Sequence, residues 1–313
     1  MSSSICLTQN FLDVLDEIEL AVAANGTAAT VGSERIQAGS EAELRAELSA
    51  AIYRKFHIRH SETAAQTPPT GEPELVERLI AEIPHRQVYQ PVAALGLQLA
   101  ETGSPTPVDV AGLKVLIHPE HLVRDAQGTI TGAYFPSYRT NTTPGYVLAL
   151  GEHGPGPGEI SRIYISSSSA SDTVRYWGPL LQALNATGCG YQAKALSTAA
   201  SHPRSDAIVL YLPRTEVNAV HMICEEALAG PHRATTPTSI FTEALGGQLA
   251  TAQEPVDPRP AYRGLSFGQH RSRVLAEALL SSARSGTTLR DVWQQAANQA
   301  RIDPHNPGRN LNR

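Results

Sequence analysis

A predicted helix start concentrates three cationic side chains. The segment SFGQHRSR begins at Ser266, and Ser266 with Gln269 makes the capping-box pattern of a helix N-terminus. This pattern places His270, Arg271 and Arg273 in the opening turns. Cations near the positive end of a helix dipole cost about 0.3–1 kcal/mol each, so we expect compensating contacts for these side chains.

Arg271 is predicted to point into the protein. It shares its helical face with Leu275 and Ala278, because residues three and four positions apart are neighbours on a helix. A buried guanidinium needs an anion, which is either a structural carboxylate or the phosphate of a substrate. Arg273 has Glu277 one turn later, which is typical of a surface ion pair, so we assign it a supporting role only.

Lys194 is the candidate for a lysine that does chemistry. The chain has only three lysines, and Lys194 lies in the predicted strand Tyr191–Leu196. Strand alternation places it on one face with Gln192. It extends its ammonium from an edge strand, pairs with a carboxylate such as Asp206, or acts as a base whose pKa is lowered by burial and by nearby arginines.

Two further arginines accompany predicted strands. The strand Arg162–Ile165 places Arg162 and Tyr164 on one face and two isoleucines on the other. The loop STAASHPRSD brings Arg204 and Asp206 to the start of a buried strand, where functional side chains are common. Arg204 and Asp206 either pair with one another or belong to a site.

Other polar segments are weaker candidates. Arg139 lies in a stretch that is either a surface turn or part of an anion site. The run Ser166–Ser169 lies between a strand and a helix, where hydroxyls cap helices or bind anions. His202 precedes a proline and is typical of a solvated turn, and His85 is a reserve for acid chemistry. No His, Cys, Asp or Glu grouping has the spacing of metal ligands, so the sequence predicts neither a metal site nor a cofactor.

Helical periodicity dominates the first hundred residues. Apolar residues three and four positions apart predict helices over residues 8–24, from Ser40 to His57 and from Glu74 to Ile83. The polar, proline-containing stretch 101–108 follows them. We therefore expect a helical N-terminal region over residues 1–106 and an α/β domain over residues 107–313.

Patterns typical of β-strands begin near residue 112. Apolar runs predict strands at Leu113–Ile117, Ile130–Phe135, Tyr146–Leu150, Arg162–Ile165, Tyr191–Leu196 and Ala207–Leu212. An amphipathic stretch over 171–186 joins two of them into a βαβ unit with parallel strands. Helices are predicted at 215–228, 267–284 and 288–301. The expected fold class is α+β, with a helical N-terminal part followed by a mixed sheet that has a βαβ unit and flanking helices.

Composition excludes several classes of protein. A net charge of −5 over 313 residues lacks the basic footprint of a nucleic-acid-binding protein. No stretch approaches the roughly 18 apolar residues of a membrane helix. The acidic N-terminal segment is unlike an export signal, and the three cysteines are too few for a disulfide framework, so we expect a cytoplasmic protein.

Several segments together resemble a known family. RIYIS, YQAKAL, the spaced Arg204 and Asp206, AIVLYLPR and above all SFGQHRSRVLAEAL are similar to the HopA-type effector family over roughly residues 112–284. Proteins similar to this family act in class V lanthipeptide and thioamitide pathways. There the resemblance implies a lyase that eliminates phosphate from phosphoserine or phosphothreonine of a precursor peptide, after a separate kinase has phosphorylated it.

The residues offer candidates for each step of such an elimination. The reaction needs a base for the α-proton, a cationic site for the phosphate and an acid or cation for its departure. We expect Lys194 to be the base and His270 the acid. Arg162, Arg204 and Arg271, with Arg139, are the expected phosphate ligands. Two alternatives remain: a peptide-binding scaffold of a modifying complex, and an effector that acts on a host protein.

Overall fold

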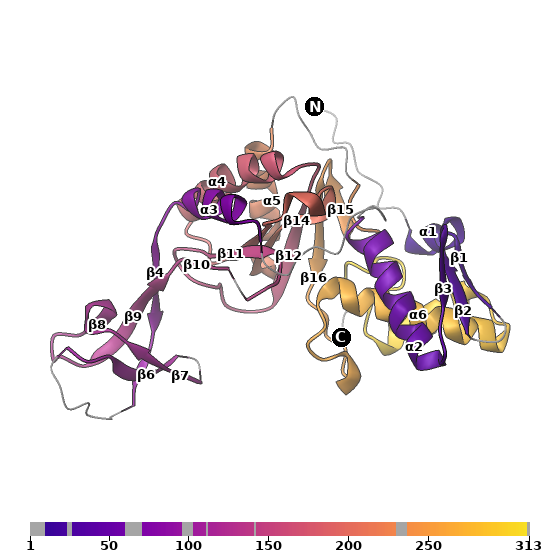
Figure 1. The fold of residues 1–313 in the computed structure, drawn as a ribbon, viewed down its shortest axis with the longest axis horizontal. Coiled ribbons are helices and arrows are strands. Elements are labelled where there is room, and N and C mark those ends of the chain that lie inside the picture. The colour runs from indigo at the N-terminus through magenta and orange to yellow at the C-terminus, as the bar shows by residue number, and fades with distance from the viewer. Residues whose placement is uncertain are drawn as a thin grey trace.

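A seven-stranded antiparallel sheet forms the centre of the protein (Figure 1). Its strand order is β10-β11-β13-β14-β12-β16-β15. The strands span Tyr138–Arg139 (β10), Tyr146–Leu150 (β11), Gln192–Leu196 (β13), Arg204–Pro213 (β14), Ile160–Ser167 (β12), Leu249–Gln253 (β16) and Glu243–Gly246 (β15). The computed structural model describes residues 10–23, 27–59, 71–95, 103–110, 112–140, 142–229 and 237–311.

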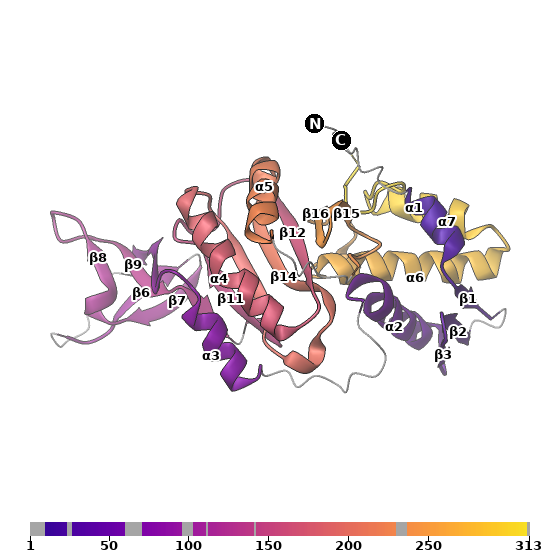
Figure 2. The ribbon, with the colours of Figure 1, turned by 90° about the horizontal axis from the view of Figure 1, so that it is seen from above.

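Helices cover the two faces of this sheet differently (Figure 2). On one side lie α3 (Pro73–Ala81), α4 (Ala170–Ala186) and α5 (Val217–Ala227). Their apolar side chains form one core with inward residues of the strands, among them Ile163, Ile165 and Leu210. On the other side, α2 (Glu41–Ile52), its continuation η1 (Tyr53–His57) and α6 (Phe267–Ser285) approach the sheet. This second side carries Arg162, Tyr164 and Lys194.

Strand β14 separates the two strands of the predicted βαβ unit. Both β12 and β13 pair antiparallel with β14, so they run in the same direction without being neighbours. The predicted parallel direction of these strands within one sheet is therefore confirmed, but they do not pair with each other, because the strand that follows the unit in sequence lies between them. The α+β class is confirmed, with helices and several sheets.

The first residues that the structure describes pack against the last helices. The helix α1 (Phe11–Glu17) is shorter than the predicted 8–24, and a small sheet of β1 (Leu20–Val22), β2 (Ala28–Val31) and β3 (Glu34–Gln37) follows it. Residues 8, 9 and 24 lie outside the described part. Apolar residues of α1, α2 and these strands share one core with α6 and with α7 (Leu289–Gln299). This core crosses the expected boundary at residue 106, and the domain division stays a prediction.

A β-rich arm projects from the body of the molecule (Figures 1 and 2). It holds two three-stranded sheets, β4-β9-β8 and β5-β6-β7. Their strands span Gln87–Pro91 (β4), Ala93–Ala94 (β5), Thr106–Val110 (β6), Leu113–Ile117 (β7), Leu122–Arg124 (β8) and Ile130–Pro136 (β9). A small separate core of Val92, Val108, Ile117 and Ala133 holds the arm together.

Three helix starts are capped by serine side chains. Ser40 accepts from the Glu43 amide and Ser169 from the Asp172 amide. The capping box of Ser266 and Gln269 is complete, since each side chain accepts from the other residue's backbone N–H. The predictions for the start of α2 and of α6 are confirmed, and one serine of the run 166–169 has the capping role.

Candidate active site

The sheet register brings Lys194, Arg162 and Tyr164 to one face. Lys194 and Tyr164 both lie opposite Val209 of the intervening strand β14, from its two sides. Residues directly opposite one another in a ladder project to the same face, and Arg162 lies two positions before Tyr164 on the same face. The predicted common face therefore exists, although β14 and not direct pairing produces it.

The ammonium of Lys194 lies in a confined cationic environment. Its Nζ atom lies 4.1 Å from the centre of the Tyr146 ring, and the residue is partly exposed. Burial lowers the pKa of Lys194 from 10.5 to about 8, Asp206 opposes this shift, and the charges of Arg162 and Arg204 add to it. A sizeable fraction of Lys194 is therefore neutral at mildly alkaline pH.

Arg204 and Asp206 form an ion pair beside the lysine. The Nε and Nη2 atoms of Arg204 donate to the two carboxylate oxygens of Asp206 at 2.7 and 2.9 Å. Tyr146 also donates its hydroxyl to Asp206, at 2.9 Å. Burial alone would raise the pKa of Asp206, but Arg204 holds it well below the usual range. Asp206 is thus ionised, and it holds both Arg204 and Tyr146, the ring that the Lys194 ammonium contacts.

Arg162 is held in a similar way on the neighbouring strand. Its Nε and Nη2 atoms each donate to Glu254 at 2.8 Å, while Nη1 lies 3.5 Å from the Tyr164 hydroxyl. Its Cζ atom lies 5.0 Å from the centre of the Tyr211 ring. In both Arg162 and Arg204 a carboxylate occupies one edge of the guanidinium, which leaves Nη1 outside that ion pair.

Two residues that the sequence analysis did not single out, Tyr53 and His57, belong to the same group of side chains. We call this group, with Lys194, Arg162, Arg204, Asp206, Tyr146 and Tyr164, the Lys194 cluster. Tyr53 and His57 both lie in η1, a π-helical turn, and such turns are frequent at functional sites. The Tyr53 ring lies 5.2 Å from the His57 ring, which in turn meets the Tyr164 ring edge to face at 5.6 Å. The only sequence signal was a pair of aromatic side chains four positions apart at the end of a predicted helix.

His57 is buried and neutral. Burial lowers its pKa to about 4, with Asp206 opposing and the nearby cations assisting. Its Nδ1 atom lies 2.9 Å from Ser239 Oγ, and its carbonyl accepts from the Ser205 hydroxyl of β14. The ring packs on Gly268, where an added Cβ would lie 2.0 Å from His57 Cδ2. The glycine of the SFG segment is therefore required for the close approach of η1 to α6.

His270 and Arg271 are both fully buried at the start of α6. Arg271 points inward as predicted, but its Nε donates to the Pro307 carbonyl at 2.8 Å and its Nη2 to Asn310 at 3.2 Å. Its Nη1 donates to His270 Nδ1 at 2.8 Å, so the other His270 nitrogen carries the proton and donates to Asp257 at 3.0 Å. Burial lowers the pKa of His270 to about 4. These contacts tie α6 to the C-terminal segment.

Comparison with known families assigns the chain through this same region. The model of the HopA1 effector protein family matches residues 137–309, which is more than half of the chain and includes Lys194, Arg204 and the start of α6. The chain belongs to the HopA1 effector protein family. The family expected from the sequence is thereby confirmed.

Two solved structures resemble this HopA1-family chain. One is the effector protein from Pseudomonas syringae pv. syringae strain 61, with 13% identity and a TM-score of 0.49, over 84% of this chain and 90% of the other. The second is the effector protein from Pseudomonas syringae pv. tomato strain DC3000, with 11% identity and a TM-score of 0.47, over 87% and 96%. No curated protein matches the chain.

The remaining predicted residues have partners of their own. Arg139 lies opposite Leu148 of β11, which lies opposite Lys194, so the register places Arg139 on the same face as Lys194. Arg139 donates to the carbonyls of Pro136 and Tyr138, at 2.6 and 2.8 Å. Arg273 pairs with Glu277 at 3.5 Å, as predicted for a surface pair. Both ring nitrogens of His85 are engaged, by the Leu150 carbonyl and Asn185. The same is true of His202, which is bound to Thr173 and to the Thr198 carbonyl and is therefore not a solvated turn residue.

Cavities adjoin the cluster on the side of α6. One, of about 480 Å³, is lined by Arg162, Glu254 and His270 among others. Leu265 and Gln269 line both this cavity and a second one, of about 540 Å³, which reaches Tyr53. The two cavities therefore share lining residues at the start of α6, and Arg162 lines the first and Tyr53 the second.

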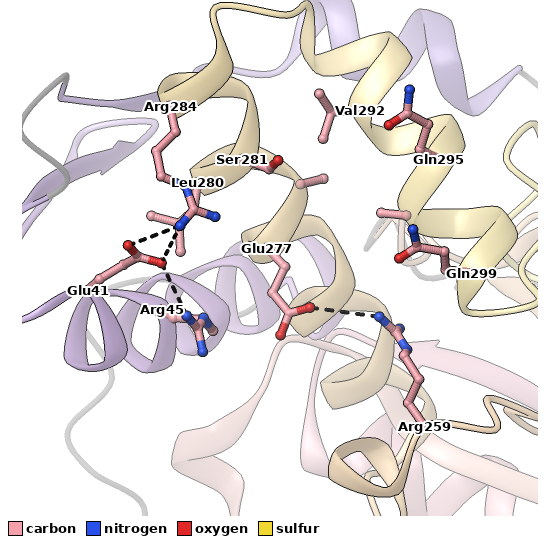
Figure 3. Close-up of a pocket in the computed structure, with 12 residues that line it drawn as sticks. Glu41, Arg45, Arg259, Glu277, Leu280, Ser281, Arg284, Val292, Gln295 and Gln299 are labelled. Atoms are coloured by element: carbon pink, nitrogen blue, oxygen red, sulfur yellow. Dashed lines mark hydrogen bonds and ion pairs between the residues drawn. The ribbon is translucent and has the colours of Figure 1, made fainter.

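A further cavity, of about 390 Å³, lies between α2, α6 and α7 (Figure 3). Its charged side chains are paired with one another. Glu41 accepts from Arg45 at 3.2 Å and from Arg284 at 3.1 Å, and Glu277 lies 3.9 Å from Arg259. The carboxylates on this side of α2 and α6 thus face the cavity of Figure 3.

Two classes of site or element are absent from the part of the chain that the structure describes. No group of three or more His, Cys, Asp or Glu side chains is placed there to hold a metal ion. None of the described helices combines the length and apolar character needed to cross a membrane.

Proposed function

We propose that this HopA1-family protein is a lyase that eliminates phosphate from phosphoserine or phosphothreonine of a peptide. One observation carries the proposal: Lys194, with its pKa lowered to about 8, lies on one sheet face with Arg162 and close to Arg204. A base that is readily neutral beside two fixed guanidiniums is the combination that phosphate β-elimination needs.

In the proposed reaction, neutral Lys194 takes the α-proton of the phosphorylated residue. The electron pair of the broken C–H bond forms the Cα=Cβ double bond, and the Cβ–O bond breaks. Phosphate leaves with the electron pair of that bond. Arg162 and Arg204 bind it and stabilise its growing negative charge, which is the larger catalytic contribution in many group-transfer enzymes. The products are a dehydroalanine or dehydrobutyrine residue and inorganic phosphate.

In this proposal His270 is not the general acid that the sequence analysis expected. His270 has a pKa of about 4 and uses both nitrogens within the protein, and His57 also has a pKa of about 4. Neither is an imidazolium near neutral pH, so neither has the extra proton of a strong acid. The leaving phosphate is instead neutralised by the guanidiniums. Arg271 is removed from the phosphate ligands, because it is fully buried and each of its three guanidinium nitrogens donates within the protein, to Pro307, His270 or Asn310.

The substrate in this proposal is made by another enzyme. We infer a separate kinase that phosphorylates Ser or Thr of a ribosomal precursor peptide, as the resemblance to lanthipeptide and thioamitide pathways implies. The second candidate function is that of an effector acting on a host protein, which membership of the HopA1 effector protein family favours. A non-catalytic peptide scaffold is the third.

Mass spectrometry of a phosphopeptide incubated with the protein tests the proposal. Elimination yields a peptide one water lighter than its unphosphorylated form, whereas phosphatase action regenerates that form. Lys194→Ala should lower the rate by roughly 10²–10⁴ while phosphopeptide binding survives. Arg204→Gln should lower both the rate of elimination and the affinity for the phosphopeptide. Full elimination by Lys194→Ala would reject the base, and binding without elimination by the wild type would favour the scaffold or the effector.

A further inference from the structure

The groove between α2 and α6 has the character of a peptide-binding surface. We define the α2–α6 groove by the second cavity above, of about 540 Å³. Ala46, Ala50 and Leu265 form its apolar part. It adjoins the candidate active site through Tyr53, which lines the groove and whose ring lies 5.2 Å from the His57 ring.

The charge of this groove is of one sign. Arg45, Arg54 and Arg273 line it, and no Asp or Glu is among its described lining residues. Their side chains are 37%, 46% and 32% exposed. The carboxylate partners of Arg45, Arg54 and Arg273 are Glu41, Glu34 and Glu277, at 3.2, 2.5 and 3.5 Å. Glu41 and Glu277 line the cavity of Figure 3, as Arg45 also does.

These arginines can exchange their partners at little cost. Exposed ion pairs contribute only about 0–1 kcal/mol each, so an incoming carboxylate competes with the existing one. Guanidiniums also bind carboxylates in a planar, two-point geometry. The groove therefore complements an acidic peptide segment with small or apolar residues between its charges.

We propose that the α2–α6 groove binds an acidic segment of the substrate peptide next to its phosphorylated residue. This inference rests on the proposed function and adds the substrate class. An extended chain advances about 3.3 Å per residue, and Tyr53 both lines the groove and lies 5.2 Å, ring to ring, from His57 in the site. The acidic residues therefore lie roughly two to four positions from the phosphorylated residue.

Binding of fluorescent synthetic phosphoserine peptides, followed by anisotropy, tests this inference. One peptide carries glutamates two to four positions from the phosphoserine, on either side, and its partner carries glutamines there. We expect the glutamate peptide to bind about tenfold more tightly at low salt, and the preference to shrink at high salt. The double variant Arg45→Gln/Arg54→Gln should abolish this preference and leave the affinity for the glutamine peptide unchanged.

Arg290→Gln is the matched control, because Arg290 is also exposed and paired with carboxylates, Asp13 and Asp16, outside the groove. It should keep the preference for glutamate. Equal binding of both peptides by the wild type, or an equal loss for both in the double variant, would overturn the inference. Elimination from both peptides at equal rates would reject the proposed role of the groove but not the lyase activity. Failure to eliminate from either peptide would reject the lyase, while the binding preference would still report on the groove.

Discussion

Replacing Lys194 by methionine should make the protein more stable. Lowering its pKa from 10.5 to about 8 means that the protonated side chain is about 3 kcal/mol less favourable in the folded protein than in water. Methionine is similar in length and uncharged, so it removes this cost. It also loses the cation–π contact with Tyr146, worth about 1 kcal/mol, which leaves a net gain of about 2 kcal/mol near neutral pH.

The gain should depend on pH in a defined direction. Between about pH 8 and pH 10.5 the unfolded chain holds a proton on Lys194 that the folded protein has released, so wild-type stability rises with pH in this window. The advantage of Lys194→Met should therefore shrink by about 2 kcal/mol between about pH 7.5 and about pH 9.5. Urea unfolding of both proteins at the two pH values measures this difference.

Lys114→Met supplies the control, because Lys114 is exposed on β7 of the arm. Its effect should stay within about 0.5 kcal/mol at both pH values. If Lys194→Met is less stable than the wild type near neutral pH, or if its advantage does not change with pH, the ammonium of Lys194 is not destabilised by its surroundings. The base assignment would then lose its physical support.

Three further outcomes test the site. Arg271→Met should destabilise the protein by about 3 kcal/mol in thermal unfolding, because the buried Pro307 carbonyl loses its donor. If stability is unchanged and phosphopeptide binding is weakened, Arg271 is a phosphate ligand after all. Gly268→Ala should lower the free energy of unfolding by about 1–3 kcal/mol, because the new methyl group clashes with His57. Most of this loss should disappear when His57 is replaced by alanine as well. An equal loss in the His57→Ala background would contradict the packing argument. The kcat/KM for elimination should rise with pH through about 8, and a falling limb between pH 6 and 8 would reveal a titrating acid.

Local patterns in the sequence were sufficient to predict elements of the central sheet, of the arm and of the C-terminal helices. The strands at Tyr146–Leu150 and Leu113–Ile117 and the long helix after Ser266 were predicted from period and capping signals, which depend on neighbouring residues only. The place of β14 was not predictable in this way. Its continuous apolar pattern shows that both faces are buried, but it does not identify the strands on either side.

For the candidate site too, relations between neighbouring residues were predictable and contacts between distant segments were not. Alternation placed Arg162 with Tyr164 and Lys194 with Gln192, because each pair lies on one strand. Tyr53 and His57 come from a segment more than a hundred residues earlier, and only the tertiary fold brings them to Arg204 and Tyr164. The inward direction of Arg271 was also predictable, but its partners were not, since Pro307 and Asn310 lie in a C-terminal loop with no periodic signal.

The core shared by the first and last helices has a consequence for synthesis of the chain. Helix α2 ends at Ile52, but α6, against which it packs, begins only at Phe267. At about 5–20 residues per second, a ribosome needs roughly 10–40 s to make the chain between them. During that interval β2 and β3, which both contact α2, are already made, but α6 is not. The surface of α2 that packs against α6 therefore stays accessible to other molecules until α6 has been synthesised.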